Sequence, residues 1–215
     1  TIVELNSETD FAAKDSNFLA YSEKVKSFIT ENKVDDVEAF VGSSLEDDRK
    51  ALVQTIGENI QLRRVETIDY SSDMNIGMYL HSDSKLGSIV AVNNGSDQIA
   101  KDIAMHVSAF NPLCLSKEDI DQDILERERV IYQNQAKESG KPEEIMEKMV
   151  EGKINRYLSE VSLLSQSFVK DPDISVADYL EKDNARIAAY VRLKVGEGIE
   201  VEVKDFAEEV AEQLK

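Results

Sequence analysis

The sequence predicts an α+β fold from which a helical hairpin protrudes. Two observations lead to this prediction. Short segments that are alternating or continuously apolar are interspersed with segments in which apolar residues recur every three or four positions. A central, highly charged segment divides into two helix-like halves at a Gly and a Pro.

The chain opens with a strand and two helices. Residues 2–6 alternate between apolar and polar side chains, which indicates a strand. A helix is predicted over about 15–31, because apolar residues recur there at helical spacing: Phe18, Tyr21, Val25, Phe28 and Ile29. A short helix near 36–42 follows.

A third helix and three strands come next. Ser44–Asp47 has the pattern of a capping box. The helix behind it is expected to bury Leu52, Val53, Ile56 and Ile60. Strands are predicted over 61–68, 76–81 and 88–93. The last is almost wholly apolar and should be the most buried.

A strand–turn–helix unit occurs twice. Residues 88–93 lead through an Asn-Asn-Gly turn into a helix predicted over 96–109. Residues 189–195 lead through Gly-Glu-Gly into a helix predicted over 204–215, which carries Phe206, Val210 and Leu214. Because the two units share few identical residues, both internal duplication and convergence on a common α+β unit stay open.

The central segment is predicted to form a helical hairpin over 117–160. Its first half, 117–139, is highly charged with a sparse apolar stripe of Ile120, Ile124 and Ile131. Ser139–Pro142 ends one helix and starts the next, whose stripe is Ile145, Met149, Val150, Ile154 and Leu158. So short a loop makes the helices antiparallel neighbours. The stripe either joins the two helices to each other, which is the safer interpretation, or meets a partner.

Composition excludes several classes of protein. The 215 residues carry a formal charge of −18, which argues against direct nucleic-acid binding, since phosphate contacts need a basic surface. No apolar run approaches the roughly 20 residues that cross a membrane. The single cysteine, Cys114, fits a reducing compartment, and we expect a cytoplasmic protein. Two histidines and one cysteine, far apart in sequence, offer no metal-binding spacing and no nucleophile–base pair. No catalytic residue, metal or cofactor is therefore expected.

The turn between the first strand and the first helix is the most informative segment, and it has two interpretations. In the local one, Thr9 or Asp10 caps the helix and Phe11 packs against the following turn. In the other, Phe11 points outward and acts as a wedge on a partner. Spacing alone favours the local interpretation.

Several motifs, in order along the chain, resemble the elongation factor Ts family. They are Val-Glu-Leu-Asn-Ser-Glu-Thr-Asp-Phe-Ala-Ala-Lys-Asp from residue 3, Asp102–Val107, Glu138–Pro142, Glu147–Lys153 and Glu160–Gln166. The resemblance implies two similar subdomains, each a small antiparallel sheet with helices, which we place at 1–95 and 96–215. It also implies that the hairpin is a coiled coil, through which some members dimerise. A small helical module normally precedes this region, so the chain is expected to correspond to the core and C-terminal part of a family member.

By resemblance, the chain promotes GDP release from elongation factor Tu and does no covalent chemistry. The loop of Thr9, Asp10, Phe11 and Ala12 matches the family residues that intrude near the partner's Mg²⁺ site. Family members commonly have valine where this chain has Ala12, and proline where it has Ser167. Further partner contacts are implied at His106 and its neighbour Met105, and at a strand tip with His81, Leu86 and Gly87. The alternative is a scaffold without exchange activity that acts through its helical hairpin.

Overall fold

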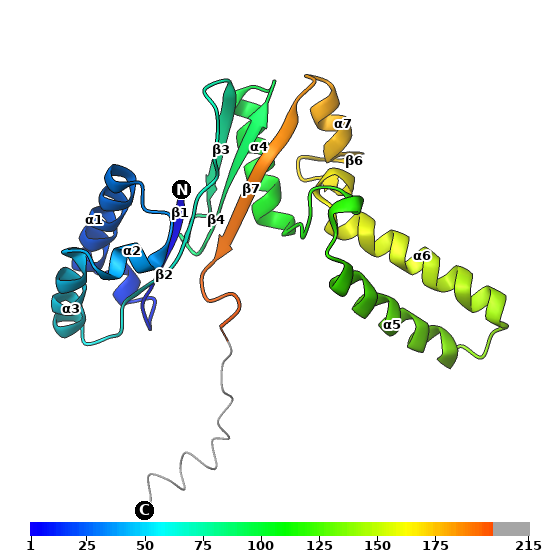
Figure 1. The fold of residues 1–215 in the computed structure, drawn as a ribbon, viewed down its shortest axis with the longest axis horizontal. Helices are drawn as coiled ribbons and strands as arrows, with labels where there is room; N and C mark the ends of the chain where they lie inside the picture. Colours follow the sequence, from blue (N-terminus) through cyan, green and yellow to red (C-terminus); the bar gives the residue numbers. More distant parts are fainter. Residues whose placement is uncertain (200–215) are drawn as a thin grey trace, which may run out of the picture.

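The computed structural model describes residues 1–199 and confirms the α+β class, with small antiparallel sheets and helices (Figure 1). The predicted C-terminal helix at 204–215, with Phe206, Val210 and Leu214, lies outside the described residues. Among the helices of the described part, none combines the length and apolar character that crossing a membrane requires.

The N-terminal region is a two-stranded sheet covered by helices. Strands β1 (Ile2–Asn6) and β2 (Gln61–Glu66) pair in antiparallel orientation. The helices α1 (Ser16–Asn32), α2 (Val37–Val41) and α3 (Leu45–Ile56) lie on one face of this sheet, as Figure 1 shows. The apolar stripe of α1 is buried as predicted, except that Phe28 is half-buried. It packs with residues from α2, α3 and β2, among them Phe40, Leu52, Leu62 and Val65.

Two predicted caps are wrong. Helix α1 is capped by Asp15, whose carboxylate accepts hydrogen bonds from the amides of Asn17 and Phe18, and not by Thr9 or Asp10. Ser44 precedes α3 without a side-chain cap, because its own backbone is already helical, whereas a capping residue has an extended one.

Helix α3 is also shorter than predicted. It ends at Gly57, which adopts φ +81°, a left-handed conformation typical of a helix end. Ile60 is therefore buried from a loop instead of from the helix.

A three-stranded antiparallel sheet forms the centre of the molecule. Its order is β3 (Met74–Leu80), β4 (Leu86–Asn93) and β7 (Arg186–Lys194). The apolar run of β4 is buried throughout, as predicted, because the strand lies between two others and α4 (Asp97–Phe110) packs against it. The core between α4 and the sheet includes Val90, Val92, Ile99, Ile103 and Val107.

The strand pairing crosses the boundary placed at residues 95 and 96. β7 follows that boundary in the sequence, yet it pairs with β4 along nearly its whole length, from Leu86 opposite Lys194 to Asn93 opposite Arg186. The two strand–turn–helix units therefore contribute strands to one sheet. The division into two domains stays a prediction.

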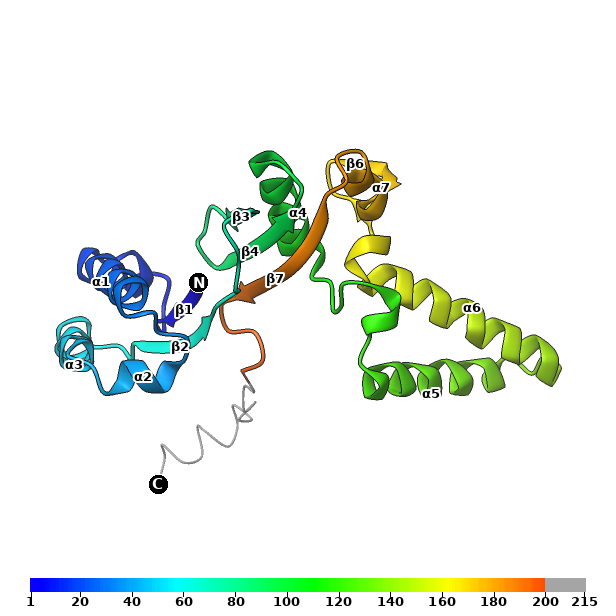
Figure 2. The ribbon, with the colours of Figure 1, turned by 45° about the horizontal axis from the view of Figure 1, so that its top comes forward.

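The predicted hairpin projects away from the sheets in both views (Figures 1 and 2). It consists of α5 (Gln122–Glu138) and α6 (Glu143–Val161). The helices pack on each other through Ala136, Val150, Ile154, Leu125, Tyr132, Met146 and Leu158. The two predicted stripes are right only in part: Ile131 on α5 and Ile145 on α6 are 47% and 46% exposed, and Ile120 precedes α5.

Three small elements that follow the hairpin in the sequence were not predicted. β5 (Ser167–Phe168) and β6 (Asp171–Ser175) form a short antiparallel pair, and α7 (Val176–Glu181) follows directly. Ser175 starts α7 with a capping box. Phe168, Val176 and Leu180 complete the core below α4.

Candidate functional site

The Thr9–Ala12 loop is anchored at both ends and exposes the residue in between. The backbone N–H and the hydroxyl of Thr9 donate to the Glu58 carboxylate at 2.9 and 2.6 Å. The amide of Ala12 donates to the Thr9 hydroxyl at 3.2 Å, and Ala12 is buried. Phe11 stands between these anchors with 88% of its surface exposed. The interpretation that Phe11 packs against the following turn is therefore wrong.

An ion pair connects this loop to the hairpin between β3 and β4. The Lys85 ammonium donates to the Asp10 carboxylate at 2.5 Å. The hydrogen bond and charge of Lys85 hold the pKa of Asp10 below its usual value, and Asp10 in turn raises the pKa of Lys85. Both side chains are accessible to water, so the pair orients the loop more than it stabilises the fold.

The tip of the β3–β4 hairpin lies beside this loop. The residues predicted there as partner contacts differ in their exposure. His81 is exposed, and its Nδ1 lies 3.2 Å from the Tyr79 hydroxyl. Leu86 is half-buried. Gly87 is buried because β1 passes over it: a Cβ there would lie 3.2 Å from the Ile2 side chain.

The tip also exposes two apolar side chains that sequence reasoning missed. Met78 and Leu80 are 69% and 66% exposed. Their alternation with half-buried Tyr79 places them on the outer face of the strand.

His106 is placed differently from these residues. It is completely buried in α4, and both ring nitrogens are satisfied. Nδ1 accepts from the Val169 amide at 3.1 Å, so Nε2 carries the proton and donates to the Gln166 side-chain oxygen at 2.9 Å. Burial lowers the pKa of His106, against a weaker opposing effect of Gln166.

The ring of His106 reaches the surface only through a neighbour. It stacks on Phe110, with 4.7 Å between ring centroids, and Phe110 is 48% exposed. Met105, the other predicted contact on α4, is half-buried. The structure thus brings the loop and the hairpin tip together and leaves His106 in the core.

The anchors of the loop could not be identified from the sequence. Glu58 and Lys85 lie 49 and 75 residues from their partners, and each is one of many charged residues in the chain. Within residues 1–199, no group of three or more His, Cys, Asp and Glu side chains is arranged to hold a metal ion. The arrangement presents an aromatic ring and a carboxylate on a tied loop, which suits insertion into another protein.

Comparison with known proteins identifies the family. The family model described as "Elongation factor TS" matches residues 8–197. An elongation factor Ts of Hahella chejuensis is 50% identical over 214 residues, which cover all of this chain and 74% of that protein. Elongation factors Ts of Legionella pneumophila (strain Paris) and Hydrogenovibrio crunogenus are 45% and 44% identical, over 74% and 72% of their lengths. The chain therefore belongs to the elongation factor Ts family of translation elongation factors.

Proposed function

We propose that this chain promotes the release of GDP from elongation factor Tu by inserting the Thr9–Ala12 loop near the Mg²⁺ and nucleotide site of that GTPase. Membership of the family supports the partner and the reaction. The observation that carries the mechanism is the 88% exposure of Phe11 on an anchored loop. Burying a phenylalanine side chain is favourable by about 1.5–3 kcal/mol, so insertion of the ring into a partner strengthens binding.

Asp10 would act beside the ring. A GTPase holds its nucleotide through a phosphate loop and a Mg²⁺ ion that bridges the phosphates. A carboxylate that arrives next to that ion competes for its ligands and waters. The pair of Asp10 with Lys85 is solvent-exposed, so exchanging it for a partner contact costs little.

Release of GDP follows from differential binding. The factor accelerates exchange if it binds the empty GTPase more tightly than the GDP-bound one. Linkage then requires GDP to weaken the binding of the factor to the GTPase by the same ratio. A new nucleotide therefore expels the factor, which can act again.

The hairpin tip and α4 would supply docking. His81, Leu86 and the exposed Met78 and Leu80 offer a surface beside the loop. Gly87 lets β1 pass close to that tip. In α4, the buried ring of His106 would support the exposed Phe110 in a partner contact. Met105, which is half-buried, would contact the partner with its exposed part.

The first experiment is stopped-flow release of a fluorescent GDP analogue from elongation factor Tu. We expect Phe11→Ala to lower the maximal stimulated rate by about tenfold or more, equivalent to roughly 1.4 kcal/mol of barrier. Complex formation with nucleotide-free partner should weaken less, because the tip still docks. Tyr70→Ala removes another exposed aromatic side chain, outside the proposed surface, and serves as the matched control.

Equal losses of release and binding in Phe11→Ala would contradict this division of labour. If the wild-type chain bound elongation factor Tu without accelerating GDP release, the chain would dock on its partner but not act as an exchange factor.

The alternative is a scaffold that acts through the α5–α6 hairpin, including self-association. Val130 and Ile131 on α5 are nearly half exposed, which favours a contact there. Light scattering that detects a dimer, together with no complex with elongation factor Tu on a sizing column, would support the scaffold.

A further inference from the structure

A buried carboxylate lies between the two sheets. Glu4 in β1 is 2% exposed. Its neighbours Val3 and Leu5 pack toward the α1–α3 helices, so Glu4 lies on the opposite face of β1, which also carries Ile2 and turns toward the central sheet. A carboxylate is expensive to bury unless its oxygens are paired.

Two consecutive arginines pair with this carboxylate. Arg63 Nη1 donates to both oxygens at 2.9 and 3.1 Å, and Arg64 donates through Nε. Consecutive residues of a regular strand point to opposite faces. Here the register shifts, because Glu4 is opposite Arg64 and Leu5 is opposite Leu62, which leaves Arg63 as the extra residue of a bulge. The bulge lets both guanidinium groups reach one carboxylate.

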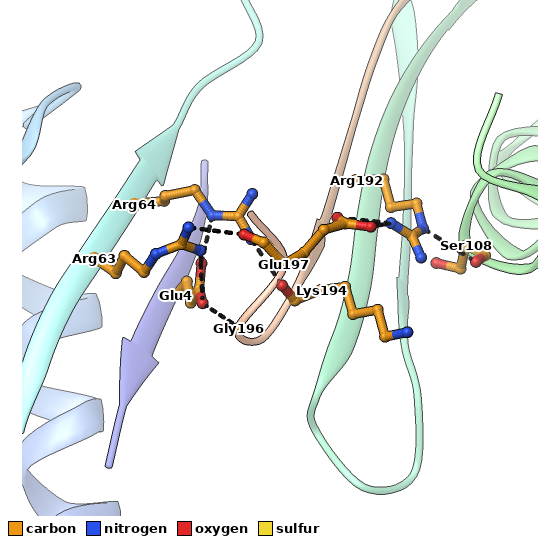
Figure 3. A network of polar contacts seen from close by, with 8 residues as sticks. All are labelled: Glu4, Arg63, Arg64, Ser108, Arg192, Lys194, Gly196 and Glu197. Carbon is orange, nitrogen blue, oxygen red and sulfur yellow. Dashed lines mark hydrogen bonds and ion pairs between the residues drawn. The ribbon is translucent and has the colours of Figure 1, made fainter. Parts of the chain in front are cut away.

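The same three side chains also hold the end of β7, an edge strand of the three-stranded sheet. Glu4 accepts from the Gly196 amide at 2.8 Å. The second arm of Arg63 donates to the Glu197 carbonyl at 2.7 Å, and that of Arg64 to the Lys194 carbonyl at 2.7 Å. Figure 3 shows the two guanidinium groups reaching from β2 to the turn behind β7.

The network extends from this turn to α4. Arg192 donates to the Glu197 carboxylate at 3.0 and 3.1 Å and to the Ser108 carbonyl at 3.3 Å (Figure 3). Planar guanidinium groups with fixed donor directions therefore connect β2 to β7, and β7 to the helix behind it.

Both parts of the proposed partner surface start at this network. β1 leads into the Thr9–Ala12 loop five residues after Glu4. At the other end, the Val195 amide donates to the Lys85 carbonyl at 2.8 Å, directly beneath the tip that binds Asp10.

We propose that Glu4, Arg63 and Arg64 are positioning residues that fix the β1–β2 sheet against the β3–β4–β7 sheet, so that the Phe11 loop and the hairpin tip meet the partner in one orientation. Buried ion pairs contribute little net stability compared with apolar residues. Their planar, multiply bonded geometry instead restricts the angle between the sheets.

The test replaces both arginines by lysine. Arg63→Lys/Arg64→Lys keeps two positive charges beside Glu4, but a lysine lacks the planar fork that reaches a carboxylate and a carbonyl together. Arg49→Lys is the matched control. Arg49 also holds a carboxylate, that of Glu46, and a carbonyl, that of Ile60, but within the α1–α3 region.

Distances between spin labels measure the orientation directly. Cysteines introduced at exposed Glu31 in α1 and Lys101 in α4 carry the labels, in a Cys114→Ser background. We expect the distance distribution to broaden in Arg63→Lys/Arg64→Lys and to keep its wild-type width in Arg49→Lys. A distribution as narrow as that of the wild type would overturn the proposal. If the double variant does not fold, Arg63→Lys alone is measured. A lysine there cannot bond Glu4 and the Glu197 carbonyl together, whereas Arg64 stays in place. The distribution should again broaden, and a wild-type width would overturn the proposal.

Nucleotide release tests the consequence, and this arm rests on the proposed function. Misoriented contacts should lower the maximal rate of GDP release by about tenfold, with less than about twofold change in the half-saturating concentration. A broadened distribution with an unchanged rate would overturn the positioning role. A wild-type chain that does not accelerate release would refute the proposed function alone, and the distances would still decide the orientation.

Discussion

Single residues in this chain take their role from burial as much as from chemical type. Its two histidines make this clear: His81 is exposed at a strand tip, and His106 has no exposed surface and two satisfied ring nitrogens. The same holds for Phe11, which an apolar residue's usual preference would place inside, but which the anchors at Thr9 and Ala12 hold outside. Residue type alone did not distinguish these cases.

The burial of His106 predicts a pH dependence of stability. Its folded-state pKa lies below the ordinary value of 6.5, so the unfolded chain takes up the proton first as the pH falls. The stability that neutral His106 contributes is therefore fully present above about pH 6.5. It is lost as the pH falls toward the folded-state pKa, by up to about 1.4 kcal/mol per pH unit.

Urea denaturation at a series of pH values between about 7 and 5, where histidine titrates and most carboxylates remain ionised, measures this dependence. His106→Gln should flatten it, even though the variant is less stable overall, and His81→Gln should keep it. An equally steep loss of stability in His106→Gln would assign the effect to other groups.

At the scale of elements, glycine positions reveal how closely the layers pack. Gly77 in β3 lies directly under α4: a Cβ there would come within 2.0 Å of the Ala100 carbonyl oxygen and 2.6 Å of the Lys101 amide. Gly152 lies inside α6, where a Cβ would meet nothing within 4 Å. Two backbones therefore approach each other closely at the strand glycine and not at the glycine of the hairpin.

Alanine at these two glycines should act in opposite directions. Gly77→Ala collides with backbone atoms, which cannot rotate away, and should destabilise the protein by about 1–3 kcal/mol or more. Gly152→Ala should stabilise the α5–α6 hairpin by about 0.5–1 kcal/mol through helix propensity. Thermal and urea unfolding of both variants provides the measurement. A neutral Gly77→Ala would mean that α4 does not pack this closely on β3.

At the scale of the whole molecule, the apolar side chains form separate clusters. The α1–α3 region, the central sheet with α4, and the α5–α6 hairpin each bury their own set. The hairpin joins the body where Leu113 and Leu163 donate backbone hydrogen bonds to Val161 and Cys114. We therefore expect the hairpin to unfold locally while the centre of the molecule stays folded.

Core truncations in two clusters test this separation. Ile154→Ala removes buried apolar surface from the hairpin, and Ile103→Ala does so from the centre, each at a cost of about 2–5 kcal/mol to its own cluster. Hydrogen exchange should accelerate only in α5 and α6 for Ile154→Ala, but throughout the central sheet for Ile103→Ala. Faster exchange of β4 in Ile154→Ala would show that the chain unfolds as one unit.

The sequence by itself determined most of the helices and strands and pointed to the candidate loop. Helical stripes, alternating strands and turn residues are local patterns, so they predicted α1, β4, α4 and α6 close to their observed bounds, whereas α5 begins at Gln122 and not at residue 117. The motif around Phe11 is equally local, and its resemblance to the family singled out the loop as a candidate, although spacing alone favoured a local role. Boundaries set by single side chains were less predictable, as Asp15 and Ser44 show.

Only the tertiary structure decided which distant segments meet. Three sets of contacts show this: the pairing of β7 with β4, the ion pair of Asp10 with Lys85, and the contacts of Glu4 with two arginines and with the turn after β7. They join residues that lie 59 to 192 positions apart. The sequence around one charge among many, or around one strand among several, does not indicate which residue or strand it will pair with. These contacts form because burial and backbone hydrogen bonding must be satisfied for the whole chain at once.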